Sequence, residues 1–247
     1  IGMVLVIITG KIDLSVGATV AFTGAMAAIV YNATNGSMLL SLAACMLAGA
    51  AIGAFQGYWV AYLKVPAFIV TLAGMLGFRG LTYVLTSIKP VGLMDDNFKK
   101  VASGFIEPSF MDGKVLAVLV GVVFLLIMVV MDIQNRRTRS RLGFEVLPMS
   151  LFIVKNVFIS AIIFWLFYKF SLDRGIPNVI VIIGLLVIAF TFMMNNTVFG
   201  RSIYAIGGNA KSAKLSGINA ERVEFYVFVI MGVMAAISGL IFTAYMN

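Results

Sequence analysis

The 247-residue sequence contains no histidine, and this absence removes several kinds of functional site. Histidine-based acid–base catalysis, serine–histidine nucleophiles and histidine-ligated metal ions are excluded within the chain. A phosphate-binding loop of the form G-x-x-x-x-G-K-S/T is also missing, so an ATP-driven function needs an ATPase from another subunit. We therefore predict no catalytic residue, no metal site and no cofactor, and we expect a protein that is not an enzyme.

Charged residues and cysteine are scarce. Only 11% of the residues are charged and 62% are hydrophobic, with a mean hydropathy of +1.07, whereas the surface of a water-soluble domain demands far more charge. The single cysteine, Cys45, lies in an apolar run and has no partner for a disulfide within the chain. We attribute the net charge of +8 to membrane topology and contact with the lipid surface, and not to binding of nucleic acid.

Long apolar runs fill the sequence instead. Most are close to the ~20 residues that a helix needs to cross ~30 Å of hydrocarbon, and they are continuous, unlike the alternating strands of a barrel. We therefore predict an all-α integral membrane protein, a polytopic helical bundle. The first run starts at Ile1, so we expect the numbering to begin inside a longer protein. The segments, about eight, are 1–9, 14–31, 38–63, 66–86, 114–132, 148–169, 177–194 and 223–246.

Basic residues between the apolar runs favour one orientation in the membrane. The positive-inside rule places 197–222, with Lys211 and Lys214, in the cytoplasm. Alternation along the chain then places 135–141, which holds four arginines, on the same side. The longest loop, 87–113, has a balanced charge and falls on the outside, as the rule predicts.

Three glycines recur every four residues in the third segment and leave one helix face bare. Gly49, Gly53 and Gly57 form this face, and small residues at such spacing let another helix approach closely. The alternative is that these glycines only make the helix flexible, since glycine is frequent in membrane helices. The spacing favours a packing face.

The stretch 197–222, TVFGRSIYAIGGNAKSAKLSGINAER, is the most informative part of the chain. As a bare pattern it is a basic loop between two spans, but FGRSIYAIGGN followed by AKLSGIN closely resembles the coupling loop of permease subunits in ribose/xylose-type ATP-binding-cassette sugar importers. In that family the loop carries a short helix that docks on the cytoplasmic ATPase. We call 197–222 the coupling segment. The residues that the resemblance assigns to it are Gly200, Arg201, Ala205, Ile206, Gly207, Gly208, Asn209, Lys211, Lys214, Leu215, Ser216 and Gly217.

Further motifs carry the same resemblance in the same order. GKIDLSVG at 10–17 matches a family signature through Asp13, Leu14, Ser15 and Gly17. Taken alone, Asp13 is expected to be the N-cap of a helix that begins near Leu14, with Ser15 adding a second acceptor. AYLKVPAFIVTLAGM within 55–80 resembles this family's turn from one span to the next. The elements FQGYW at 55–59, GFRGLT at 77–82 and DRGIP at 173–177 resemble the xylose and multiple-sugar permeases more narrowly.

The resemblance implies a function and a set of partners. It implies that 1–247 is a single transmembrane permease domain that lacks its N-terminal and C-terminal parts, in the inner membrane of a bacterium. The implied function is the translocation subunit of an ATP-driven monosaccharide importer. The implied partners are a cytoplasmic ATPase subunit, an extracytoplasmic sugar-binding protein, a second permease copy in a homodimer, and the lipid bilayer.

Polar residues within the spans are candidates for lining the sugar pathway, but each can equally bond a neighbouring helix. They are Gln56, Thr71, Ser41 and Asn32. Two rival functions stay open. An ion-coupled secondary sugar transporter usually needs a titratable carboxylate in mid-span, which is not seen in the sequence. A membrane scaffold without transport activity is the other.

Overall fold

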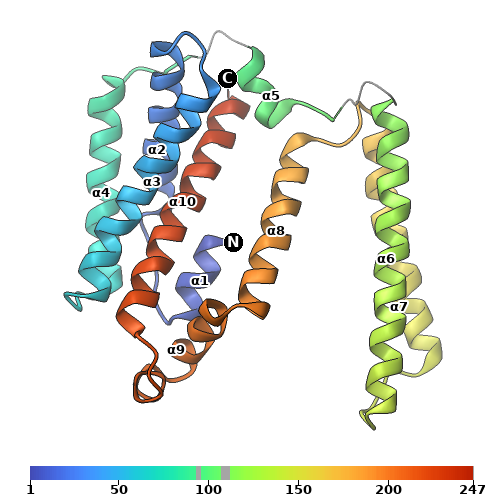
Figure 1. Ribbon diagram of the computed structural model, residues 1–247. Coiled ribbons are helices and arrows are strands. Elements are labelled where there is room, and N and C mark those ends of the chain that lie inside the picture. Colours follow the sequence, from blue (N-terminus) through green and yellow to red (C-terminus); the bar gives the residue numbers. More distant parts are fainter. Residues whose placement is uncertain (93–95, 107–111, 247) are drawn as a thin grey trace. The chain divides into compact units, whose positions relative to one another are not determined.

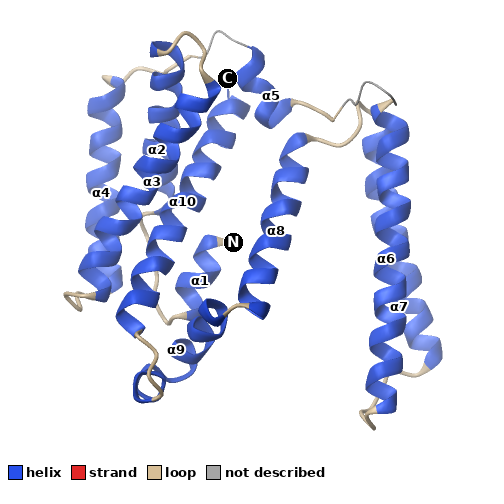
Figure 2. Cartoon of the chain, viewed as in Figure 1, coloured by secondary structure: helices blue, strands red, loops and turns tan. Residues whose placement is uncertain are grey.

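A computed structural model describes residues 1–92, 96–106 and 112–246, and its described elements are all α-helices (Figures 1 and 2). The predicted all-α membrane class is confirmed. Two compact units are present: unit 1 comprises Ile1–Ser103 with Ile182–Asn247, and unit 2 comprises Gly104–Val181. The helices are α1 (Gly2–Ile8), α2 (Val16–Ala33), α3 (Met38–Ala61), α4 (Ala67–Thr86), α5 (Asp96–Ser103), α6 (Gly113–Arg141), α7 (Met149–Leu172), α8 (Asn178–Asn196), α9 (Val198–Leu215) and α10 (Ala220–Met246).

Seven of the described helices are long and apolar enough to cross a membrane. The predicted segment 1–9 forms α1, a helix of seven residues. The predicted outer loop 87–113 contains the short helix α5, whose Phe98 packs edge-on against Tyr31 of α2 with 4.9 Å between ring centroids. Residues 93–95 and 107–111 of that loop lie outside the described part of the chain.

Helix starts follow local chemistry. Ser37 Oγ accepts from the backbone N–H of Leu40 at the start of α3, and Asp112 Oδ1 accepts from that of Lys114 at the start of α6, at 3.5 and 2.9 Å. Side-chain acceptors at these positions satisfy N–H groups that have no partner inside the helix. Pro66 stands directly before α4, where its missing N–H has no cost.

The helix α10 lies at the centre of unit 1 and packs against α2, α3, α5, α9 and α1. Its contact with α3 is made through glycines: a Cβ atom added at Gly49 would collide with the carbonyl oxygen of Gly232, and one at Gly53 with that of Phe228. A Cβ at Gly57 would lie 3.0 Å from the carbonyl oxygen of Phe225. The glycine face of α3 therefore lies against α10, at a distance too short for a Cβ at Gly49 or Gly53.

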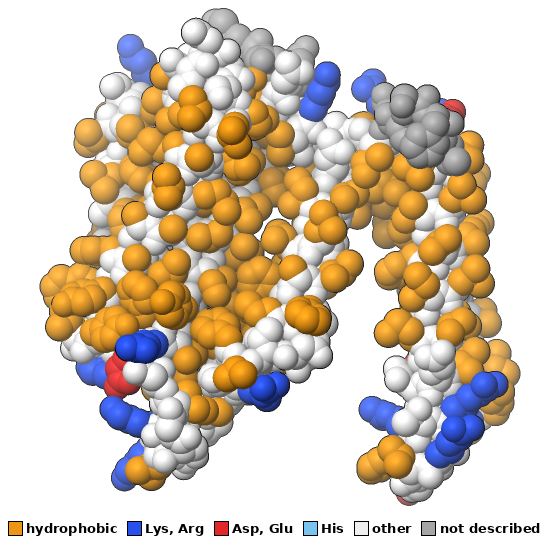
Figure 3. All heavy atoms as spheres, in the orientation of Figure 1, with side chains coloured by type: hydrophobic (Ala, Val, Ile, Leu, Met, Phe, Trp, Pro, Cys, Tyr) orange, Lys and Arg blue, Asp and Glu red, His pale blue; other side chains and the backbone are white. Residues whose placement is uncertain are grey.

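Unit 2 is an antiparallel pair formed by α6 and α7 (Figure 1). At their contact, a Cβ at Gly121 would come within 2.7 Å of Cβ and Cγ of Phe167, so a glycine allows the aromatic ring to pack here. The helix α6 continues through 135–141, which the sequence placed between two spans, and ends at Arg141. Apolar side chains cover the long helices while Lys and Arg gather at their ends (Figure 3), the distribution expected of membrane spans.

Candidate functional site

The coupling segment folds as two short helices instead of an open loop. The helical geometry of α9 is interrupted at Asn209, whose backbone is extended (φ −158°, ψ 101°). Asn209 Oδ1 accepts from the N–H of Ser212 at 2.9 Å and so caps the second piece, while Thr197 Oγ1 caps the first by accepting from Gly200 N–H at 3.1 Å. Gly217 follows the end of α9 at Leu215 and has φ +84°, a conformation that favours glycine.

The first piece of α9 is anchored to unit 1. Ile203 and Ile206 are buried, and a Cβ at Gly200 would collide with the carbonyl oxygen of Met194. On the next turn, a Cβ at Gly207 would collide with the carbonyl oxygen of Ile8, the last residue of α1. Small residues are therefore required here because backbone from α1 and α8 comes within contact distance.

The second piece presents most of its surface outward. Ala213 is buried beside Ile206 and Ala220 and fixes one face. Ala205 in the first piece is half-buried. Around Gly208, a Cβ would meet nothing within 4 Å. The exposed residues of the predicted set are Arg201, Gly207, Gly208, Asn209, Lys211, Lys214, Leu215, Ser216 and Gly217. Leu215, with 82% of its surface exposed, is an apolar residue without a covering element in the described structure.

Ion pairs join the second piece to the start of α10. Lys214 Nζ lies 3.0 Å from Glu221 Oε1, and Lys64 Nζ, from the turn between α3 and α4, lies 3.4 Å from the same oxygen. One turn further along α10, Glu224 Oε1 lies 2.7 Å from Lys11 Nζ in the α1–α2 connection. Three separate stretches thus meet at one end of α10, where Figure 3 shows basic and acidic side chains together. The sequence analysis missed the roles of Lys64, Glu221 and Glu224, since only the fold brings them together.

Two signature residues, Asp13 and Ser15, form a buried hydrogen-bonded chain with Gln56 of α3. Asp13 Oδ1 accepts from Ser15 N–H at 2.8 Å and from Ser15 Oγ–H at 2.6 Å, and Ser15 Oγ accepts from Gln56 Nε2–H at 2.7 Å. The expectation that Asp13 caps the helix is wrong: α2 starts at Val16 with Ser15 at the N-cap position, and Asp13 instead forms a turn with Ser15. Burial raises the pKa of the Asp13 carboxyl, and the hydrogen bonds from Ser15 oppose that shift.

The other two signature residues make no comparable contact. The side chain of Leu14 is exposed, and a Cβ at Gly17 would have open space around it.

All four pathway candidates form hydrogen bonds within unit 1. Gln56 is 2% exposed and holds Ser15, and Ser41 Oγ donates to Ala27 O at 2.7 Å. Thr71 Oγ1 donates to Ala67 O at 2.8 Å and lies 3.4 Å from Ile12 O. Asn32 is exposed and donates to Gly92 O at 3.0 Å. These bonds support packing roles for the first three, and lining of a pathway stays a prediction.

The chain is similar to permeases of known transport systems. The family described as "Branched-chain amino acid transport system / permease component" matches residues 1–247. The xylose transport system permease proteins XylH of Haemophilus influenzae and Escherichia coli K12 are 37% and 38% identical over 99% of this chain, which covers 64% and 61% of their lengths. The ribose import permease protein RbsC of Escherichia coli K12 is 32% identical over 98% of the chain and 55% of its own length. The chain thus spans about three fifths of these relatives, and no solved structure matches it significantly.

Proposed function

Since the chain belongs to the family described as the permease component of the branched-chain amino acid transport system, we propose that it forms the membrane-spanning part of an ATP-driven importer of a monosaccharide. The similarity to permeases named for xylose and ribose supports a pentose or a related neutral sugar. By this proposal the chain acts in the bacterial inner membrane as one permease domain. It is not an enzyme and does no covalent chemistry, and a separate ATPase hydrolyses ATP.

One observation carries the proposal: the coupling segment is exposed on one side and joined to the central helix on the other. Gly208, just before the break at Asn209, and Lys211 in the second piece are both exposed, which suits docking on an ATPase. Lys214 links the same piece to Glu221 in the first turn of α10. Since α10 packs against α2, α3 and α1, a displacement of the docked piece moves the start of the helix around which unit 1 is built.

The proposed mechanism is alternating access driven from the coupling segment. Closure of two ATPase modules moves two copies of the segment, and α10 tilts with its attached helices. The extracytoplasmic sugar-binding protein delivers the sugar from the opposite side. A neutral polyhydroxylated solute needs no fixed charge in the pathway, which agrees with the apolar character of the described spans.

Replacement of Gly208 by tryptophan tests the docking role, because Gly208 is exposed and a Cβ added there meets nothing within 4 Å. In membranes carrying the complete importer, Gly208→Trp is expected to leave folding and membrane insertion intact and to abolish sugar-stimulated ATP hydrolysis and uptake. Leu142→Trp is the matched control, since Leu142 is an exposed apolar residue at the end of α6. Normal coupling in Gly208→Trp, together with a failure of this position to crosslink to the ATPase, would exclude the docking role.

A secondary transporter is the alternative function, and it makes the opposite prediction about energy supply. Uptake that persists after deletion of the ATPase gene but stops with an uncoupler would establish the alternative. Uptake that requires the ATPase, and co-purification of the chain with it, would support the importer. A screen of sugars against the co-purified binding protein then identifies the substrate.

A further inference from the structure

A groove of about 650 Å³ lies between α6 and α7 in unit 2, at the end where the apolar part of α6 gives way to arginines. Its polar rim comes from α6 and consists of Arg136, Arg137, Ser140 and Arg141. Its apolar wall comes from both helices and includes Val129, Ile133, Ile153 and Val157. The volume is in the range of small-molecule sites, and the surface is basic at one end and apolar at the other.

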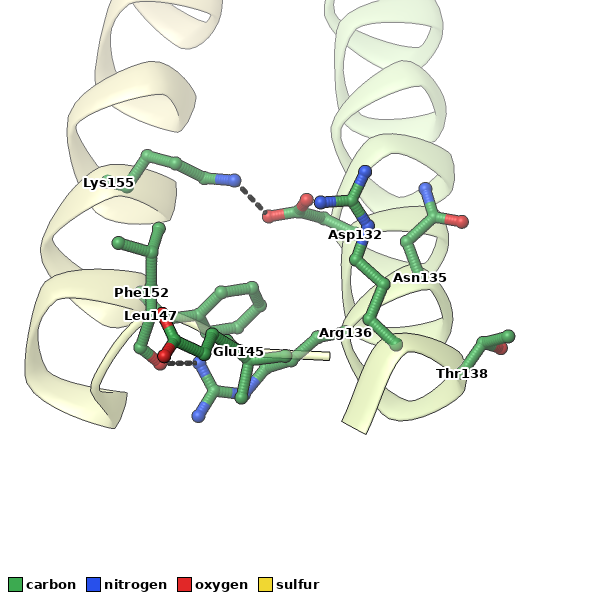
Figure 4. Close-up of a pocket in the computed structure, with 10 residues that line it drawn as sticks. Asp132, Asn135, Arg136, Thr138, Glu145, Leu147, Phe152 and Lys155 are labelled. Carbon is green, nitrogen blue, oxygen red and sulfur yellow. Dashed lines mark hydrogen bonds and ion pairs between the residues drawn. The ribbon is translucent and has the colours of Figure 1, made fainter. Parts of the chain in front are cut away.

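The rim is strongly basic. Three arginines line the groove, and no carboxylate is among its described lining residues. Two acidic residues, Asp132 and Glu145, line a neighbouring hollow of about 580 Å³ that shares Arg136 and Phe152 with the groove. Asp132 Oδ2 is already paired with Lys155 Nζ at 2.7 Å (Figure 4), so its charge is compensated locally. Even with Glu145 counted against the three arginines, the groove offers net positive charge to an anion.

Arg136 is held in place before any ligand binds. One of its Nη1–H groups donates to the carbonyl oxygen of Leu147 at 2.6 Å, and its guanidinium carbon lies 4.8 Å from the centre of the Phe152 ring. Figure 4 shows the Arg136 side chain beside that ring, with the contact to Leu147 marked. A guanidinium has five N–H donors, so further donors of Arg136 stay available to a ligand. A fixed orientation lowers the entropy lost on binding.

One residue of the groove wall, Asn156, carries a buried acceptor without a partner in the described structure. Asn156 lines the groove and is 9% exposed; its Nδ2 donates to Asp132 Oδ2 and to Phe152 O. Asn156 Oδ1 is the buried side-chain atom that has no hydrogen-bond partner within the described structure. A buried acceptor of this kind is costly to leave unpaired, so a ligand with a hydroxyl donor would be favoured here.

We propose that this groove binds an anionic glycerophospholipid whose headgroup carries hydroxyl groups, such as phosphatidylglycerol. The phosphodiester contacts Arg136, Arg137 and Arg141, a headgroup hydroxyl donates to Asn156 Oδ1, and an acyl chain lies along the apolar wall. Charge complementarity selects the anionic headgroup, because arginine binds phosphate oxygens well. The continuous apolar wall selects a lipid over a soluble phosphate compound, since a basic pocket between membrane helices suits a lipid headgroup.

Native mass spectrometry of the detergent-purified protein tests the site by titration with phosphatidylglycerol. Phosphatidylcholine of the same acyl chains is expected to bind at least tenfold more weakly. Arg137→Gln and Arg141→Gln are each expected to weaken phosphatidylglycerol binding about fivefold, on the order of one basic residue near a lipid surface. Arg139→Gln is the matched control, because Arg139 lies on the same helix and lines only the neighbouring hollow; its effect is expected to stay within about twofold.

Several results would overturn the proposal. An equal loss in Arg139→Gln would mean that general surface charge attracts the lipid, and equal binding of the two lipids would remove the anion site. Displacement by equimolar inorganic phosphate, or by an acidic peptide, would assign the arginines to a soluble anion or to a protein partner. Phosphatidylmethanol, which is anionic but has no headgroup hydroxyl, tests Asn156: if it binds as tightly as phosphatidylglycerol, Asn156 Oδ1 has no role.

Discussion

Replacement of Gly53 by leucine should destabilise unit 1, because the glycine lies against the backbone of α10. A Cβ at this position would collide with the carbonyl oxygen of Phe228 and lie 2.9 Å from Cα of Val229. Both are backbone atoms and cannot rotate away as a flexible side chain does. The two helices must therefore separate to admit even the first carbon of the leucine side chain.

The size of the effect follows from two opposing terms. Overpacking a well-packed interior costs about 1–3 kcal/mol for added methylenes, and leucine adds four carbons, so we take about 3 kcal/mol. The replacement also removes the helix-propensity cost of glycine, which contributes up to about 1 kcal/mol in the other direction. The net loss is about 2 kcal/mol, which for a domain of this size corresponds to a fall in Tm of roughly 4–8 °C.

The single cysteine provides the assay. Cys45 is fully buried in α3, and its thiol donates to Ala236 O of α10 at 3.2 Å, so it becomes reactive when these helices separate. The temperature at which a maleimide dye modifies Cys45 in the purified chain should fall in Gly53→Leu. Gly77→Leu is the control, because a Cβ at Gly77 in the middle of α4 meets nothing within 4 Å, and the midpoint should not fall there. Wild-type protection of Cys45 in Gly53→Leu would refute the packing argument.

Further predictions concern charge and topology. Burial raises the folded-state pKa of Asp13 above its ordinary value of 3.8. The contribution of the Asp13 carboxyl to the free energy of unfolding should therefore decrease as the pH rises from 3.8 through the raised pKa. Asp13→Asn should therefore gain stability relative to wild type across this window, and a pH-independent difference between their chemical-denaturation midpoints would contradict this. Glu224→Gln should lower the free energy of unfolding by about 1–3 kcal/mol, because it leaves the well-shielded Lys11 amine without its charged partner. Glu221 is more exposed, so Glu221→Gln should lower it by less than about 1 kcal/mol. Equal thermal midpoints for the two variants would oppose this ranking. In a Cys45→Ala background, Thr138→Cys should be labelled from the cytoplasmic side and Asn97→Cys from the outer side. If an impermeant reagent labels intact cells at position 138 and not at position 97, the topology is inverted.

Part of the candidate site could be predicted from the sequence, because its signals are local. The two ends of α9 are set by Thr197 and Gly217, a side-chain cap and a residue suited to positive φ. The break at Asn209 was not predicted, although asparagine before a short helix is a known capping signal. The assignment of Asp13 failed for a similar reason: its hydrogen bonds to Ser15 replace a helix cap with a turn.

The sequence by itself determined the membrane class and the approximate spans, since hydropathy is read along a single stretch of ~20 residues. Only the tertiary structure decided which surfaces meet. The bond from Gln56 to Ser15 joins residues 41 positions apart, and the contact of Cys45 with Ala236 joins residues 191 positions apart. Glycine spacing showed that α3 has a face that another helix can approach, but the partner, α10, depends on complementary glycines and carbonyl groups that come together only when the chain packs.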